Sequence, residues 1–220
     1  MPVLSTAQVP YIQWKKCFGS TAADYGKTII QTSDGGFVLG AMSISTTGQV
    51  TGNHGGADFW IVRMNDTGAI LWAKCYGGSS SDNLMNIQQT ADGGFIAVGN
   101  TSSNDSQVSG NHGMSDVWVL KISDTGLLQW QKCLGGSGMD KCNYVQQTAD
   151  GGYILTGGSN SSNGDVTVNH GGFDVWLVKL SATGGLQWQK SYGGSNDDNG
   201  AAVVQTADGG YLVSANAGSN

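Results

Sequence analysis

Three copies of one polar motif hold most of the side chains of this 220-residue chain that could do chemistry. Each copy reads Asn-His-Gly followed by glycine or methionine, with an aspartate four residues after the histidine. Its members are Asn53, His54 and Asp58, then Asn111, His112 and Asp116, and finally Asn169, His170 and Asp174. Four further aspartates follow short segments rich in glycine and serine: Asp24, Asp82, Asp140 and Asp198. Because amide, imidazole and carboxylate groups can bind sugar hydroxyl groups, these residues are the predicted ligand-binding set.

The same residues allow a structural interpretation. Asp and Asn side chains commonly hydrogen-bond to the backbone of their own loop, and glycine permits the positive φ angles that tight loops need. The histidines could then tie each loop to a neighbouring unit. Because duplication copies structural residues whether or not they bind a ligand, the repetition does not decide between the two interpretations.

Neither catalysis nor metal binding is predicted. The chain has no nucleophile-elbow pattern, and near-identical units do not provide the single asymmetric set of groups that an enzyme needs. The three histidines lie in separate units, and the Asn-His-x-x-x-Asp spacing matches no metal-ligand pattern. We therefore expect no enzyme activity, no metal and no cofactor.

The polar loops belong to a repeat of 58 residues. A Trp-x-Lys-x-(Phe/Tyr/Leu)-Gly element begins at Trp14, Trp72, Trp130 and Trp188. An Asp-Gly-Gly-(Phe/Tyr) element begins at Asp34, Asp92, Asp150 and Asp208. A fixed period of this length is typical of repeat architectures, so the fold is predicted for each repeat and not for the chain as a whole.

Each repeat predicts four β-strands. In the third repeat they are expected at Asn143–Thr148, Tyr153–Ser159, Phe173–Leu180 and Leu186–Tyr192. Asp-Gly-Gly and Thr-Gly supply tight turns for two hairpins, and a recurring four-stranded antiparallel sheet is typical of a propeller blade. The predicted fold class is therefore an all-β, four-bladed β-propeller. In a propeller the polar loops of both kinds open on one face, which would place the predicted ligand-binding set on one rim.

The recurring aromatic and amide side chains have two interpretations each. Third-strand tryptophans are expected to pack between blades, with sugar stacking as the alternative; they are Trp60, Trp118 and Trp176. First-strand glutamines could line the central channel or close the core; they are Gln31, Gln89, Gln147 and Gln205.

The segment Asp174–Leu180, followed by Thr183-Gly184 and Trp188, resembles the quinoprotein-type (PQQ-like) propeller repeat. The fuller pattern begins with Gln-Thr-Ala-Asp-Gly-Gly-Tyr and continues with Asp-x-Trp, two aliphatic residues and Lys or Arg. It is similar to repeats of uncharacterised secreted or cell-surface proteins of bacteria and archaea. The resemblance covers nearly the whole chain and implies a secreted or surface location, but it carries no assigned activity. Quinoprotein dehydrogenases have larger rings, and this chain lacks their adjacent cysteines, so a degenerate enzyme of that kind is a third alternative.

The phase of the repeat predicts how the ring closes. The repeats span 14–71, 72–129, 130–187 and 188–220, and the last is completed by 1–13. Val3–Thr6 aligns with a third strand and Tyr11–Phe18 with a fourth, so the two ends of the chain are expected to share one blade. The prediction is a single closed monomeric domain, 1–220. Two alternatives remain open: a segment of a longer array, and two chains that share blades.

Composition narrows the function classes. The 36 glycines and only 12% charged residues are typical of short strands joined by turns, and a net charge of −6 argues against nucleic-acid binding. No apolar run is long enough for a membrane helix, and the first residues do not form an intact signal peptide. Three cysteines share one repeat position, which disfavours pairing, so free buried thiols are expected at Cys17, Cys75, Cys133 and Cys142.

The predicted function is a non-catalytic binding module of a secreted or cell-surface protein. Its ligand is expected to be a carbohydrate, bound several times through the polar loops, because repeated weak sites gain avidity. The alternative is a structural or protein-interaction scaffold without a small-molecule ligand. Since only three repeats contain the histidine motif, three sites and one blank blade are expected.

Overall fold

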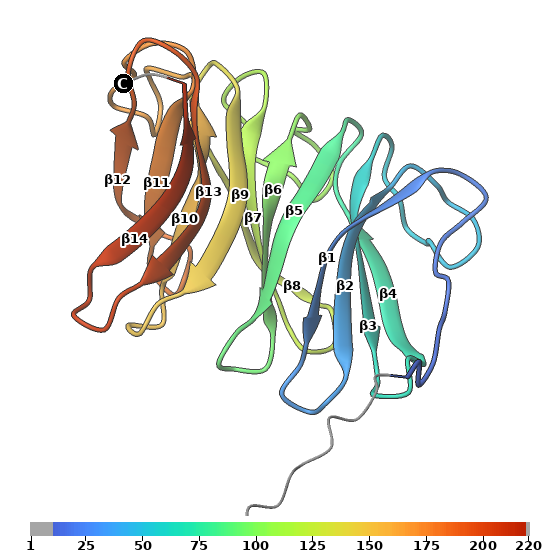
Figure 1. The fold of residues 1–220 in the computed structure, drawn as a ribbon. Coiled ribbons are helices and arrows are strands. Elements are labelled where there is room, and N and C mark those ends of the chain that lie inside the picture. The colour runs from blue at the N-terminus through green and yellow to red at the C-terminus, as the bar shows by residue number, and fades with distance from the viewer. Residues whose placement is uncertain (1–10, 219–220) are drawn as a thin grey trace, which may run out of the picture.

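The computed structural model describes residues 11–218, which form 14 antiparallel β-strands in four separate sheets (Figure 1). We call each sheet a blade and number the blades in chain order. Blade 1 contains β1 (Asp24–Gln31), β2 (Phe37–Ser43), β3 (Asp58–Met64) and β4 (Ile70–Tyr76). Blade 2 contains β5 (Asp82–Gln89), β6 (Phe95–Thr101), β7 (Asp116–Ile122) and β8 (Leu128–Leu134). Blade 3 contains β9 (Asp140–Gln147), β10 (Tyr153–Ser159), β11 (Asp174–Leu180) and β12 (Leu186–Tyr192), and blade 4 contains only β13 (Asp198–Gln205) and β14 (Tyr211–Ala217).

The all-β prediction is confirmed. No helix occurs among residues 11–218, and hence none that could span a membrane. In the third repeat, the predicted second and fourth strands match β10 and β12, and the third differs by one residue. The first strand starts earlier than predicted, at Asp140, because the buried side chain of this residue anchors the strand end. The Asp-Gly-Gly turns work as expected: the first glycine has a positive φ in all four repeats, as at Gly93 with 82°.

The blades stand side by side in one row (Figure 1). Within each complete blade the strands follow chain order, so that the first and fourth strands form the two edges. The first strands form the line of contact between blades: β5 packs against β1 and β2, β9 against β5 and β6, and β13 against β9 and β10. We call the contact between two successive blades a junction.

Apolar side chains fill each junction. Val38 of blade 1 and Ile87 of blade 2 are both fully buried and belong to the same cluster. At the next junctions Ile96 is buried in one cluster with Val145, and Ile154 in another with Val203. The third-strand tryptophans are also buried, and Trp118 packs edge-on against Phe59 of blade 1. The prediction that these tryptophans pack between blades is confirmed for Trp118 and Trp176. Trp60, at the end of the row, packs instead within blade 1 and near Phe18.

The fourth-strand tryptophans lie across the junctions on the next blade. Trp72 packs against Phe95 with a centroid distance of 6.3 Å, and its Nε1–H donates to the backbone oxygen of Asp124 at 2.8 Å. The ring covers Gly126, where φ is 72° and an added Cβ would lie 3.1 Å from the indole. Glycine is required there both for the left-handed backbone and for the close approach of the indole ring.

A backbone-to-amide hydrogen bond also recurs at the junctions. The Ser33 N–H donates to Gln89 Oε1 at 2.8 Å across the first junction. Ala91 and Ala149 donate in the same way to Gln147 and Gln205 of the next blades, also at 2.8 Å. The first-strand glutamines therefore connect neighbouring blades, in agreement with a core-closing role.

The predicted closed ring is not formed among the described residues. Blade 1 and blade 4 lie at opposite ends of the row (Figure 1), and β14 has no strand on its outer edge. Tyr11–Phe18 was predicted to be the fourth strand of blade 4, but this segment forms no strand and instead places Trp14 on blade 1, 5.7 Å from the Phe37 ring. A lone strand gains no ladder hydrogen bonds unless a third strand lies beside it. The predicted third strand, Val3–Thr6, lies outside the described residues.

Candidate functional site

Each Asn-His loop fixes its histidine through a buried aspartate. The Nδ1 atom of His54 lies 2.7 Å from Asp58 Oδ2, which also accepts the backbone N–H of His54 at 3.0 Å. The same pair of contacts joins His112 to Asp116 and His170 to Asp174. Since a carboxylate accepts from Nδ1–H, a neutral imidazole presents Nε2 as a free acceptor.

The three histidine rings remain accessible, whereas their aspartates do not. The side chains of His54, His112 and His170 are 24%, 41% and 44% exposed. The carboxylates to which they bind are completely buried. The imidazole is therefore the group of each Asp–His pair that a ligand can reach.

The asparagines serve the loop itself. Asn53 Nδ2 donates to the backbone oxygens of Ser43 and Gly56, each at 3.0 Å, and Asn53 Oδ1 accepts the N–H of Gly55 at 3.0 Å. Asn169 makes the equivalent contacts. Asn111 Nδ2 donates to the backbone oxygens of Thr101 and Ser103, and Asn111 Oδ1 accepts the N–H of Gly113. All three amides are used within the fold, which agrees with the structural interpretation of these residues.

Across each junction the loop aspartate meets the first aspartate of the next blade. At the first junction an added Cβ on Gly77 would lie 2.5 Å from Asp58 Oδ1 and 2.7 Å from Asp82 Oδ2, so both carboxylates face the same small space. Equivalent pairs lie beside Gly135 and Gly193; they are Asp116 with Asp140 and Asp174 with Asp198. Asp24 is at the free end of blade 1 and is held by the N–H and hydroxyl groups of Ser20.

The second aspartate of each pair is surrounded by neutral donors. Asp82 accepts from the N–H of Gly78 at 2.7 Å, from the Ser103 hydroxyl at 3.0 Å and from the Thr101 hydroxyl. By contrast, Asp58 Oδ1 has no hydrogen-bond donor among residues 11–218. Burial raises the pKa of Asp58 and of Asp82, and the nearby Asp58 charge raises the pKa of Asp82 further. These acids are therefore part of the junction core and are inaccessible to a ligand.

The prediction that both kinds of polar loop share a face agrees with the backbone contacts. The N–H of Gly56 donates to the oxygen of Ser79, and the N–H of Asp82 donates to the oxygen of Ala57 at 2.5 Å. The structure thus brings together the predicted residues of neighbouring repeats. Of these residues, it leaves the imidazoles as the most accessible chemical groups on the rim.

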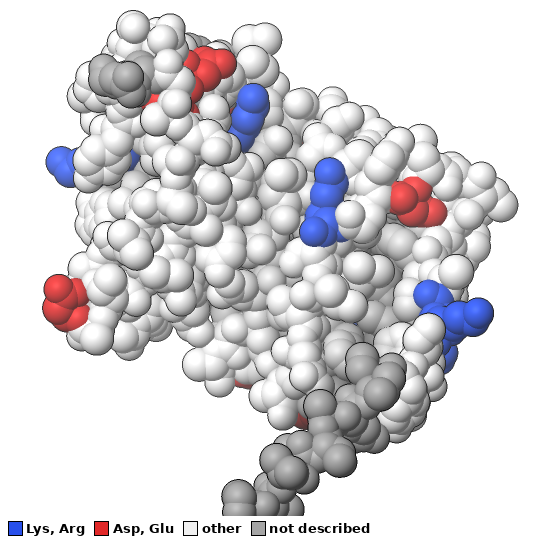
Figure 2. All heavy atoms as spheres, in the orientation of Figure 1, with Lys and Arg blue, Asp and Glu red and all other residues white. Residues whose placement is uncertain are grey.

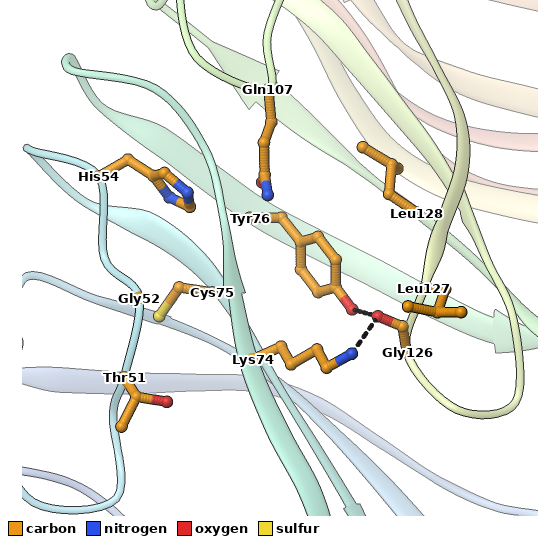
Figure 3. A pocket seen from close by; sticks show the side chains of 10 residues that line it. All are labelled: Thr51, Gly52, His54, Lys74, Cys75, Tyr76, Gln107, Gly126, Leu127 and Leu128. Atoms are coloured by element: carbon orange, nitrogen blue, oxygen red, sulfur yellow. Dashed lines mark hydrogen bonds between the residues drawn. The ribbon is translucent and has the colours of Figure 1, made fainter.

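A pocket of about 400 Å³ lies beside His54 at the junction of blades 1 and 2. Figure 3 shows the side chains of His54, Lys74, Tyr76 and Gln107 directed toward the same space. The wall on the blade 2 side consists of Gly126 and two leucines, Leu127 and Leu128. Thr51, Gly52 and Cys75 complete the lining.

The pocket combines fixed and free polar groups. Lys74 Nζ and the Tyr76 hydroxyl both donate to the Gly126 oxygen, at 2.9 and 2.8 Å, which holds the two blades together. Gln107 Oε1 accepts the N–H of Gly77 at 3.2 Å, so its Nε2 amide donors remain available. His54 Nε2 offers an acceptor, Gln107 offers a donor, and the leucines offer an apolar surface.

Sequence reasoning missed this part of the pocket because it relied on what the repeats share. The equivalents of Tyr76 are Leu134 and Tyr192, and the equivalent of Gln107 in blade 3 is Asp165. The positions at which otherwise matching repeats differ could have indicated this pocket from the sequence. They distinguish the first junction from the second and third.

The four cysteines and the aspartates of the Asp-Gly-Gly turns have structural roles. All four thiols are free; Cys75, Cys133 and Cys142 are buried, whereas Cys17 is exposed, contrary to the expectation, because residues 12–18 have no neighbouring strand. Burial raises the pKa of Cys75 to about 12. On the opposite face Asp34, Asp92 and Asp150 of the Asp-Gly-Gly turns pair with buried third-strand cations, as Asp92 does with Lys121 at 2.8 Å. No group of three or more metal-ligating side chains occurs in the described part of the chain.

No protein-family model matches the chain, and no curated protein matches it. Among solved structures, the chain is similar to a protein of unknown function from Bacteroides caccae. The identity is 12%, the TM-score is 0.39, and the match covers 80% of this chain and 70% of the other. A similarity at this level supports no conclusion about function, and the resemblance to quinoprotein-type repeats remains a prediction.

Proposed function

We propose that the chain is a binding module that takes a small hydroxyl-rich ligand, such as a carbohydrate, in the pocket at the junction of blades 1 and 2. The observation that carries this proposal is the position of His54. Its ring lines the pocket, and the contact of its Nδ1 with the buried Asp58 leaves Nε2 as the free ring nitrogen.

The chemistry of the pocket fits a sugar. A hydroxyl group can donate to His54 Nε2 while a neighbouring hydroxyl accepts from Gln107 Nε2. Leu127, which is 63% exposed, provides an apolar surface for the C–H face of a sugar ring. One such contact set binds weakly, so useful affinity would come from several sites on one surface.

Glycan-array screening followed by calorimetry tests the proposal. We expect His54→Ala and Gln107→Ala to weaken binding of the best glycan at least tenfold. His170→Ala is the matched control, because His170 makes the same loop contacts but does not line this pocket. It should retain most of the binding.

Two results would contradict the proposal. One is the absence of any glycan hit with a folded protein. The other is equal loss of binding in His54→Ala and His170→Ala, which would point to the loop fold and not to the pocket.

A scaffold function is the second candidate, and a specific observation favours it. The Asn and Asp side chains of the loops are used within the fold, as with Asn53 and Asp58, so most of the loop conservation between repeats has a structural explanation. A scaffold predicts a protein partner in pull-downs and loops that tolerate His→Ala changes without loss of that partner.

The proposal includes completion of blade 4 by an N-terminal segment, as expected from the repeat. The support is the docking of Trp14: its Nε1–H donates to the Asp66 oxygen at 3.2 Å, as Trp72 donates to Asp124. Residues 12–18 thus occupy the position of a preceding fourth strand against blade 1. Completion within one chain would give the four-bladed ring. A secreted or surface location, implied by the resemblance, is also part of the proposal and is testable by fractionation of the source organism.

A further inference from the structure

We infer that the end of the row at β14 is a docking surface for a second copy of this chain, whose blade 1 and Trp14 segment complete blade 4. This inference rests on the proposed completion of blade 4 and not on the proposed ligand. It assigns the completing segment to another molecule.

The two ends of the row carry the two halves of one junction. In the repeat, Leu212 of β14 is equivalent to Val38, Ile96 and Ile154, which are all fully buried, yet Leu212 is 65% exposed. Ile29 of β1 is equivalent to Ile87, Val145 and Val203, which are at most 1% exposed, yet Ile29 is 60% exposed. Since these two sets meet at every internal junction, Leu212 and Ile29 are the apolar partners that an additional junction would bury.

The donor and the acceptor of the recurring backbone-to-glutamine hydrogen bond also lie at opposite ends of the row. By the 58-residue period, the next donor after Ala149 is the N–H of Ala207, and the acceptor that precedes Gln89 is Oε1 of Gln31. Neither atom has a partner within residues 11–218. Docking one copy on the next would form this bond and continue an interface that the chain already makes three times.

The surface around β14 is hollowed in a way that fits this partner. A depression of about 210 Å³ is lined by Val203, Val204, Leu212 and neighbouring residues of β13 and β14, and has a mainly apolar lining. A second groove, of about 320 Å³, runs between β14 and blade 3 where a third strand of blade 4 would lie. Tyr192 in that groove is 56% exposed, whereas its equivalent Tyr76 is 2% exposed. Figure 2 shows few charged side chains over the first strands, so little charge opposes apolar contact there.

A second copy fits better than the same chain. The Trp14 segment is already seated on blade 1, at the end of the row farthest from β14 (Figure 1). To reach its own β14, the row would have to curl until its ends meet. A second copy can bring its blade 1 to β14 with the Trp14 segment left in place.

Two copies related by a twofold axis would satisfy both ends at once. Each copy contributes three complete blades and part of each of two shared blades, which gives a closed ring of eight. Closure removes the free edge at β14.

The mass of the 220-residue chain in solution gives the first test. Light scattering should yield twice 22.8 kDa for the wild type and 22.8 kDa for Leu212→Asp. Leu71→Asp is the control, because Leu71 is 58% exposed on β4 and lies at neither end face. It should remain a dimer. A monomeric wild type, or a polydisperse series of larger assemblies, would overturn the inference.

Engineered cysteines identify the origin of the completing segment even if Leu212→Asp misfolds. In a Cys17→Ser background, Ile29→Cys protein is mixed with Leu212→Cys protein and oxidised. A crosslinked pair in the mixture supports the second copy. A crosslinked monomer in the double variant, with no product in the mixture, would show that the blade is completed by its own chain and contradict this inference. No crosslink in either sample would contradict both proposals.

Discussion

The junction between blades 1 and 2 and the free end at β14 are built from the same repeat, yet their side chains have opposite surroundings. Val38 is buried at the first and Leu212 is 65% exposed at the second; Tyr76 is 2% exposed and Tyr192 is 56% exposed. The repeat sequence therefore specifies half of an interface on each side of a blade. Burial, hydrogen bonding and the pocket all depend on the presence of the neighbouring half.

The largest expected difference concerns the core side chains of the two regions. Ile87→Ala should lower the free energy of unfolding by about 2–5 kcal/mol, because it leaves a cavity in a fully buried cluster. Ile29→Ala, made in the Leu212→Asp monomer, should change it by less than about 1 kcal/mol, because Ile29 is 60% exposed. Urea unfolding of both variants measures the difference. Equal losses would show that blade 1 has a neighbour in the monomer.

Glycine substitutions compare the Thr-Gly turn under Trp72 with a free turn. Gly126→Ala should cost about 2–3 kcal/mol, since the alanine must adopt a φ of 72° and displace the indole. Gly209→Ala also has a positive φ, 86°, but an added Cβ there meets open space, so only about 1 kcal/mol is expected. Thermal unfolding, with Trp72 fluorescence as a second readout, distinguishes the two. Similar costs without a fluorescence change would contradict the packing described for Gly126.

Removing one hydroxyl should have a smaller effect. Tyr76→Phe loses the hydrogen bond to the Gly126 oxygen across a closed junction, at a cost of about 1 kcal/mol. Tyr192→Phe in the Leu212→Asp monomer should be nearly neutral, because Tyr192 is 56% exposed and has no wall opposite it. Denaturant midpoints for the pair provide the measurement. A larger loss from Tyr192→Phe would mean that the end at β14 is covered in the monomer.

The change of the free energy of unfolding with pH should be the smallest of these effects. It should differ between the junction aspartates and the turn aspartates. Because burial raises the pKa of Asp58 and of Asp82 on folding, the folded state gains stability as pH falls through the raised pKa of these carboxyls toward their ordinary value near 4. The Lys121 ion pair and hydrogen bonds lower the pKa of Asp92 to about 2, outweighing its partial burial, so its contribution is lost as pH falls from about 4 through 2.

Variants separate these two limbs of the pH profile. Urea unfolding across pH 2–8 should show the highest stability near pH 4. Asp58→Asn should flatten the slope above pH 4, and Asp92→Asn should flatten the slope below it. An unchanged upper slope in Asp58→Asn would contradict the raised pKa of the buried Asp58 carboxyl.

The strands, turns and junction aromatics could be predicted because the repeat copies them. The Asp-Gly-Gly and Thr-Gly turns specify two hairpins in a unit, whatever its neighbours are. The burial of Asp58 and Asp82 could not be predicted, since a repeated aspartate in a polar loop is compatible with either a rim or a core position. The residues that bury each of these aspartates come from two successive repeats and not from one.

The pocket and the exposed ends of the row could not be predicted from the 58-residue repeat for the same reason. Gln107 and Leu127 contribute to the site only because blade 2 is adjacent to His54. Leu127 differs from its equivalents Ala69 and Gly185, and Gln107 differs from Asp165 of blade 3. The position of Trp14 on blade 1 follows its repeat position, but the period alone does not say which molecule provides the rest of that blade.

The most direct test of the account concerns whether a complete junction, and not the loop alone, makes the site. Imidazole nitrogen signals of His54 and His170 can be followed by NMR in the Leu212→Asp monomer during titration with methyl glycosides of glucose, galactose, mannose and N-acetylglucosamine. The account predicts Nδ1–H tautomers for both histidines and a saturable shift of the His54 Nε2 signal alone, for at least one glycoside. Equal shifts at His54 and His170, or no shift at either histidine, would contradict it.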